Sequence, residues 1–142
     1  MKIYAVIDTN VLVAAMLTRH KDSATNRIVE AVNNLQITPV YHKDIIEEYR
    51  NVLSRSKFGF HPIDVERMIN VITTYGILTF RETSNEFFPD PDDAVFYEVA
   101  LSKDGAYLVT GNLKHFPKKP IVVTPAEMLQ ILEDNGLLQD DH

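Results

Sequence analysis

Six polar side chains of this sequence occur where a strand-like run ends or where a helix-like pattern begins. They are Asp8, Asn10, Asp92, Asp93, Thr110 and Asn112. Carboxylates that are drawn together without a lysine or arginine raise one another's pKa, and such groups persist when a divalent cation occupies them. Ligands that are all oxygen suit Mg²⁺ or Mn²⁺. The commonest reaction at such a site is phosphoryl transfer, so these residues favour metal-dependent phosphoester chemistry.

Asp8 has two competing interpretations. It follows the β-branched run at residues 3–7 and precedes an apolar helical stretch at residues 11–17. The carboxyl ends of parallel strands face the functional crevice of an open α/β sheet, which favours a functional acid. Aspartate is also a good helix cap, and this structural role fits the sequence equally well. The two interpretations become compatible if Thr9 and Asn10 cap the helix and leave Asp8 to face a metal.

The helix expected at residues 42–54 carries another candidate acid. At about 100° per residue, Ile45 and Tyr49 fall on one apolar face. Glu48 lies on the edge of that face, whereas Glu47 points almost directly away from it. An acid at the rim of a buried stripe is a better candidate for chemistry than an acid in full solvent, so Glu48 joins the candidate residues.

Alternating strand and helix patterns indicate an α/β fold. Strands are expected near residues 2–7, 36–41, 77–81, 106–110 and 121–123, and helices near 11–17, 24–33, 42–54, 62–75, 91–103 and 125–135. The interior strands are almost wholly apolar, which is typical of a parallel sheet covered on both faces. We therefore predict a three-layer α/β/α sandwich with a central, mostly parallel sheet of about five strands. Residues 1–135 are expected to form a single domain, and residues 136–142 a short, flexible tail.

Three local features of this layout carry further expectations. Asp93 begins the helix that leads into the strand at residues 106–110. Connectivity then puts Asp93 at the sheet edge opposite Asp8, unless the helix start bends over the site. Pro39 interrupts its strand, which suggests an edge strand or a late start. Gly76 is expected to end the helix before it.

The composition limits the class of protein. The chain has 142 residues, enough for one core, and no cysteine, which excludes disulfides and thiolate metal sites. No apolar run approaches the roughly 18 residues of a membrane span, and no signal-peptide pattern is visible. We therefore expect a cytoplasmic location without membrane association. The formal charge of −6 argues against electrostatic coating of nucleic acid, but it is compatible with a nucleic-acid enzyme that has an acidic site.

Four motifs of the chain resemble those of PIN-domain ribonucleases, specifically the toxins of type II toxin–antitoxin pairs (VapC-like). The motifs are Ile7-Asp8-Thr9-Asn10-Val11-Leu12-Val13, Ile45-Ile46-Glu47-Glu48-Tyr49, Pro89-Asp90-Pro91-Asp92-Asp93, and Leu108-Val109-Thr110-Gly111-Asn112 followed by His115-Phe116. The likeness covers roughly residues 2–130. Each motif is weak alone, but the four in this order and spacing, in an α/β chain of this size, are strong together.

The resemblance implies an endoribonuclease that binds one or two divalent ions, Mg²⁺ or Mn²⁺, and cuts single-stranded RNA to leave a 3′-hydroxyl and a 5′-phosphate. The corresponding residues are Asp8, Glu48 and Asp93 as catalytic acids and metal ligands, Asp92 as an alternative to Asp93, Asn112 as a further ligand, and Asn10 and Thr110 as groups that orient the first acid. Asn112 is a departure, because the family has a fourth acid at this position. An asparagine offers an oxygen but no charge, which puts activity in question.

The resemblance also implies partners. A toxin of this kind is expected as a homodimer that is held by a cognate antitoxin protein. A basic group near the end of the chain could guide the RNA backbone, although a solvated loop explains it as well. Its members are Lys114, His115, Lys118 and Lys119.

Two other functions remain open from the sequence. The first is a PIN-like domain that has lost catalysis and serves as a binding module, which Asn112 would explain. The second is a receiver-like or phosphohydrolase-like domain in which Asp8 is phosphorylated. A receiver-like domain would need a lysine after a late strand, and this sequence has none that is well placed. That alternative also gives Glu48 no role.

Overall fold

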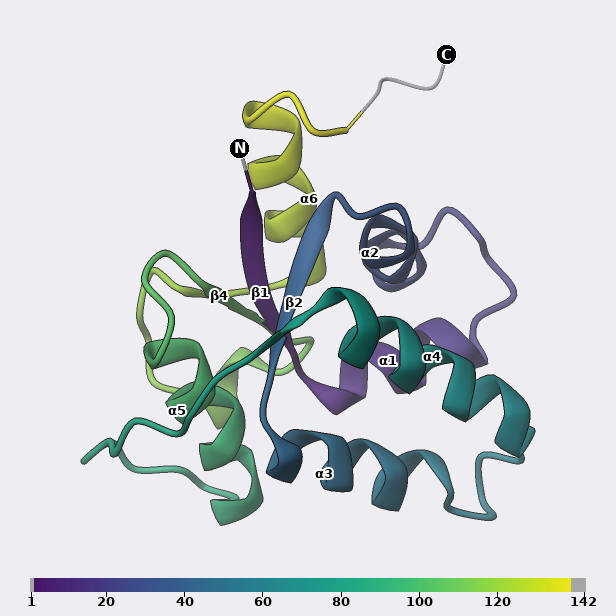
Figure 1. The fold of residues 1–142 in the computed structure, drawn as a ribbon, viewed down its shortest axis with the longest axis horizontal. Helices are drawn as coiled ribbons and strands as arrows, with labels where there is room; N and C mark the ends of the chain where they lie inside the picture. The colour runs from purple at the N-terminus through teal and green to yellow at the C-terminus, as the bar shows by residue number, and fades with distance from the viewer. Residues whose placement is uncertain (1, 139–142) are drawn as a thin grey trace.

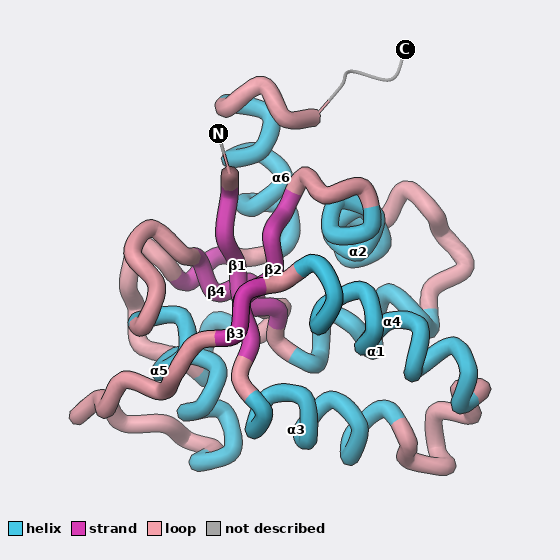
Figure 2. Tube along the Cα trace, in the orientation of Figure 1, coloured by secondary structure: helices cyan, strands magenta, loops and turns pink. Residues whose placement is uncertain are grey.

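A computed structural model describes residues 2–138, which form a five-stranded parallel sheet with six α-helices around it (Figures 1 and 2). The strands are β1 (Ile3–Ile7), β2 (Ile37–Tyr41), β3 (Ile77–Leu78), β4 (Tyr107–Val109) and β5 (Val122–Val123), in the sheet order β3-β2-β1-β4-β5. The helices are α1 (Thr9–Leu17), α2 (Ala24–Asn33), α3 (Lys43–Leu53), α4 (Pro62–Tyr75), α5 (Ala94–Leu101) and α6 (Pro125–Asp134). Two short 3₁₀ turns are η1 (Pro91–Asp93) and η2 (Leu113–His115).

The helices cover both faces of the sheet, so the predicted three-layer α/β fold is confirmed. Helix α5 packs against β1 and β4 on one face, and α4 and α2 pack against β2 on the other (Figure 1). Helix α2 also packs against α1 and against α6. Helix α3 lies across the end of the sheet where β1 and β2 finish, and it contacts α1, α4 and α5 (Figure 1).

Strand β1 is the central strand of the sheet. It pairs in parallel with β2 on one side and with β4 on the other, where Ile7 is opposite Val109. The side chains of β1 are almost all buried, as a strand covered on both faces requires. Because β1 and β4 are neighbours and end in register, the residues that follow them, from Asp8 and Thr110 onward, meet at one edge of the sheet.

Helix starts follow the local sequence closely. Ser23 caps α2 by accepting a hydrogen bond from the Asn26 amide. Thr124 and Glu127 form the reciprocal capping box that opens α6. Helix α5 is shorter than expected and ends at Leu101, and β3 has two residues where five were expected.

Pro39 does not mark an edge strand, so that prediction is wrong. It lies within β2, which is flanked by β1 and β3. The short strand β3 pairs only with Val40 and Tyr41, so the absent amide of Pro39 costs no ladder hydrogen bond on that side. Gly76 ends α4 as predicted, but with an extended backbone and not a left-handed one. Glycine is needed there because a Cβ atom would lie 2.6 Å from the Pro39 carbonyl oxygen.

The described end of the chain is packed against the body of the protein. Leu137 donates its amide to the Leu132 carbonyl, and its own carbonyl accepts a hydrogen bond from the Gln36 side chain. Of the predicted tail at residues 136–142, the last four residues lie outside the described residues. Within residues 2–138, no helix is long and apolar enough to cross a membrane.

Candidate active site

Asp8 is held at the end of β1 by groups from two strands. Its side chain is buried, with a relative exposure of 4%, and its amide donates to the Val109 carbonyl. One carboxylate oxygen, Oδ2, accepts hydrogen bonds from the Thr110 hydroxyl at 2.8 Å and from the Asn10 amide at 2.9 Å. The Gly111 amide donates to the Asn10 side-chain oxygen, which fixes the orientation of that amide group. The contacts expected of Asn10 and Thr110 are therefore present in the structure.

Asp8 also occupies the cap position of α1, but its side chain makes no capping hydrogen bond. The expectation that Thr9 and Asn10 cap this helix is wrong. The Thr9 hydroxyl is buried without a hydrogen-bond partner among the described residues, and the Asn10 side chain bonds to Asp8, Thr110 and Gly111. Helix α1 therefore starts without a side-chain cap, and the polar side chain of Asn10 holds the Asp8 carboxylate instead.

The charge of Asp8 is unfavourable in this position. The pKa of Asp8 is raised to about 6, mainly by burial and in smaller part by the nearby charge of Asp93. The Thr110 hydroxyl and the backbone amides of Thr9 and Asn10 act in the opposite direction. The hydrogen bonds therefore orient the carboxylate without fully offsetting the cost of burying its charge. A cation bound nearby would stabilise the ionised form of Asp8.

Asp93 lies at the same edge of the sheet as Asp8, so its predicted placement at the opposite edge is wrong. Helix α5 runs antiparallel to the strands, and its first turn therefore begins at the edge where the strands end. The contact between Asp93 Oδ2 and His115 Nδ1, 3.1 Å apart, joins the start of this helix to the segment after β4. Burial and the charge of Asp90 raise the pKa of Asp93, whereas the hydrogen bond from His115 lowers it.

Glu48 on α3 is influenced by the charges of the acids that precede α5. It is half-buried and Glu47 is exposed, as the helical pattern predicted. Burial raises the pKa of Glu48, followed by the charge of Asp92, with smaller contributions in the same direction from Asp90 and Asp93. The charge of Arg55 opposes this shift.

Tyr49 fixes α3 relative to the first strand, a contact that the sequence did not reveal. Its fully buried hydroxyl donates a hydrogen bond to the Ile7 carbonyl, one residue before Asp8. Burial, with the charge of Asp8, raises the pKa of Tyr49 far above its usual range, so the hydroxyl remains a donor. The backbone that presents Glu48 is thereby tied to the backbone that presents Asp8.

Asp90 is a further acid at this edge of the sheet, and it caps the 3₁₀ turn η1. Its side chain accepts a hydrogen bond from the Asp92 amide at 3.0 Å, which confirms the cap. Its charge also acts on Glu48 and on Asp93. The cap is recognisable from the sequence, whereas the effect of Asp90 on Glu48 depends on how the chain folds.

The donor chemistry of this acidic group suits a hard divalent cation. The group comprises Asp8, Glu48, Asp90, Asp92 and Asp93, and three of these acids have raised pKa values that a positive charge would lower again. Across residues 2–138, no three acidic or histidine side chains stand close enough together to hold an ion as they lie. Mg²⁺ is usually bound by one or two carboxylates and keeps several waters, so the group fits such an ion without a closed protein cage.

The remaining candidate residues are Asn112 and the predicted basic group after β4. Asn112 donates its backbone amide to the Thr110 hydroxyl at 3.0 Å. Lys114, which lies within η2, and Lys118, which follows it, are both exposed. Lys119 forms an ion pair with Glu86, at 3.3 Å. His115 is thus the member of the predicted basic group with a direct contact to a candidate acid.

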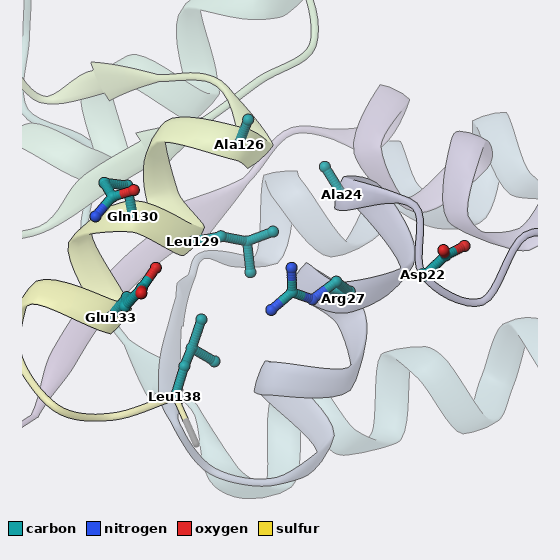
Figure 3. A pocket seen from close by; sticks show the side chains of 8 residues that line it. All are labelled: Asp22, Ala24, Arg27, Ala126, Leu129, Gln130, Glu133 and Leu138. Atoms are coloured by element: carbon teal, nitrogen blue, oxygen red, sulfur yellow. The ribbon is translucent and has the colours of Figure 1, made fainter. Parts of the chain in front are cut away.

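A separate cleft of roughly 270 Å³ lies between α2 and α6, and none of the candidate acids lines it. Side chains of α6, among them Leu129 and Glu133, face Ala24 and Arg27 of α2 across this cleft (Figure 3). Leu138 closes one end (Figure 3). The cleft therefore plays no part in the acidic site.

Comparison with known proteins agrees with the fold. Searches among curated proteins and among solved structures gave no significant match. The chain matches the PIN domain family over residues 4–114, which includes β1, α3, η1 and β4 and hence every candidate acid. PIN domains are generally nucleases that use divalent metals and act on RNA. The chain belongs to the PIN domain family.

Proposed function

We propose that this protein is a divalent-metal-dependent endoribonuclease, with Asp8, Glu48 and Asp93 as its metal-binding catalytic acids. The observation that carries the proposal is the electrostatic grouping of these three carboxylates at the carboxyl edge of a PIN-domain sheet. Each has a raised pKa, and the charge of Asp93 contributes to the shifts of both other acids. Like charges that are kept together at a cost in stability are typical of a cation site.

The chain's own residues have distinct parts in this proposal. Asp8, Glu48 and Asp93 would hold Mg²⁺ or Mn²⁺, with Asp92 and the Asn112 oxygen as further ligands. When bound, the cation would polarise the scissile phosphate and lower the pKa of an attacking water. Thr110 and Asn10 hold one oxygen of Asp8, which leaves its second oxygen to face the ion. His115 orients Asp93 through its Nδ1 contact.

A cleavage assay tests the enzymatic part. Single-stranded RNA is incubated with the protein and Mn²⁺ or Mg²⁺, and the ends of the products are identified. We expect 3′-hydroxyl and 5′-phosphate ends, and a rate that falls by roughly a hundredfold or more in Asp8→Asn and in Asp93→Asn, because each change removes charge that stabilises the transition state. Asp104→Asn, at an exposed turn at the opposite edge of the sheet, serves as the matched control. Cleavage that continues in Asp8→Asn, or that proceeds equally well with a chelator, would refute this function.

We further propose that the nuclease is the toxin of a type II toxin–antitoxin pair, acting in the cytoplasm as a homodimer. This part is supported by the VapC-like motifs of the sequence. A small open reading frame beside the gene should encode an antitoxin that forms a complex with the protein. Expression of the protein alone should arrest growth, and co-expression of the small partner should restore it. Unimpaired growth during expression of folded protein would count against the toxin role but not against the nuclease.

Asn112 favours a second candidate function, that of a PIN domain with weakened or absent catalysis that serves as a binding module. An asparagine at this position has no charge with which to hold a second ion. This alternative predicts RNA binding without cleavage, and restored cleavage in Asn112→Asp. The family match speaks against the receiver-like alternative, because it assigns the acid after β1 to a PIN domain.

A further inference from the structure

Phe87 is the most exposed of the large apolar side chains in the described part of the chain, with a relative exposure of 83%. Its two neighbours are both anchored. Phe88 packs against Tyr97 and Phe116, with ring centroids 5.7 and 6.3 Å apart, and Glu86 pairs with Lys119. The backbone on either side of Phe87 is therefore held in place while its ring remains in solvent.

The anchoring contacts connect Phe87 to the acidic site. Phe116, which holds Phe88, directly follows His115, whose ring contacts Asp93. Phe87 also precedes Asp90 by three residues, so their Cα atoms are at most roughly 11 Å apart. The segment that carries Phe87 returns from β3 to the start of η1 and α5 (Figure 1). Phe87 thus lies near the rim of the acidic group, on a segment anchored to Phe116, the neighbour of the residue that contacts Asp93.

A neutral aromatic ring at this rim matches a requirement of the proposed reaction. Carboxylates without a cation repel the phosphates of RNA, and a chain with a net charge of −6 offers little general attraction for a polyanion. Stacking of a base on an aromatic ring supplies affinity that does not depend on charge or on sequence. We propose that Phe87 stacks on a base of single-stranded RNA whose phosphodiester lies at the acids, an inference that rests on the proposed nuclease function.

Another aromatic pair is less suited to this role. Phe58 and Phe60 stack on each other with centroids 5.4 Å apart, and Lys57 lies over the Phe58 ring. Their faces are thus partly occupied within their own loop. The Phe87 ring is free on both faces among the described contacts, which makes it the better platform.

The test uses the Asp8→Asn background, so that RNA is bound but not cut. A short single-stranded oligoribonucleotide with a fluorescent label is compared with an abasic oligomer of the same length. We expect Phe87→Ala to weaken binding of the oligoribonucleotide by roughly tenfold, since a base–aromatic stack contributes about that much affinity. Binding of the abasic oligomer should not change. Because Phe87 is exposed, its removal should leave the fold intact, which a melting curve checks.

The absence of tryptophan from the sequence permits a direct optical readout. Phe87→Trp creates a single tryptophan, which can be excited selectively and whose emission should be quenched by the oligoribonucleotide but not by the abasic oligomer. Tyr75→Trp, at the exposed end of α4, is the matched control and should not respond. Bound RNA without quenching, or equal affinity in Phe87→Ala, would overturn the inference and leave the nuclease function intact.

Two other outcomes are also decisive. If Phe87→Ala keeps its affinity for RNA but loses a protein partner, the ring is a protein contact and the inference is wrong. If neither the parent protein nor any variant binds or cuts RNA, the proposed function fails, and the inference fails with it.

Discussion

Replacement of Asp8 by asparagine is expected to stabilise the cation-free protein at neutral pH. Burial raises the pKa of Asp8 from 3.8 to about 6, so the folded state holds a proton that the unfolded state releases between these values. Stability therefore falls as the pH rises from about 4 to 6, and above pH 6 the ionised carboxylate costs roughly 3 kcal/mol. Asparagine has the same shape and no charge to bury. The variant should melt about 10 °C higher than the parent at pH 7.5.

The assay is thermal unfolding of both proteins in chelator between pH 4 and pH 8. The difference in melting temperature should be small near pH 4, grow up to about pH 6, and then stay constant, because ionisation of Asp8 in the unfolded parent is only beginning to favour unfolding at the low end. Asp104→Asn should change the stability by no more than about 0.5 kcal/mol at any pH, as is usual for an exposed site. If the difference in melting temperature does not depend on pH, or if the variant melts below the parent at pH 7.5, burial of the Asp8 charge does not oppose folding.

Three further substitutions test the positions around the site. Tyr49→Phe removes the hydrogen bond to the Ile7 carbonyl and leaves that buried acceptor unpaired, so urea unfolding should show a loss of about 1–3 kcal/mol. Gly76→Ala would place a methyl group 2.3 Å from a backbone oxygen, and a loss above about 2 kcal/mol is expected; an unchanged midpoint would contradict the packing at the end of α4. Asn112→Asp should strengthen Mn²⁺ binding by roughly tenfold in calorimetry, because it adds a charged oxygen ligand, and no gain would place this side chain outside the metal site.

Much of the fold was predictable because its signals are local. The β-branched run of β1, the capping box of α6 and the apolar stripe of α3 each follow from the spacing of residues along one element. The same kind of argument placed Glu48 at the rim of a buried face and Glu47 in solvent. These features depend on periodicity, which the sequence records directly.

The features that escaped prediction depend on contacts between distant segments. Asp93 was expected at the edge where β4 begins, because α5 leads into β4. Helix α5 runs antiparallel to the strands, however, so its first turn lies at the edge where the strands end. Thr9 and Asn10 were expected to cap α1. Because β4 places Thr110 beside β1, the Asn10 side chain bonds to Thr110 and Asp8 and does not cap the helix. The second role of Asp90 arises from the neighbouring helix α3. None of these contacts has a signature within a short window of sequence.

The central claim is that Glu48 from α3 joins Asp8 and Asp93 in one cation site, and calorimetric titration with Mn²⁺ tests it most directly. Glu47→Gln and Glu48→Gln make the same chemical change at adjacent residues, of which Glu47 is exposed and Glu48 is half-buried and influenced by the charges of the nearby acids. We predict that Glu48→Gln weakens Mn²⁺ binding by roughly tenfold or more and that Glu47→Gln leaves it unchanged, because only the first removes a charged ligand. Equal affinities in the two variants, or no Mn²⁺ binding by the parent protein, would contradict the claim.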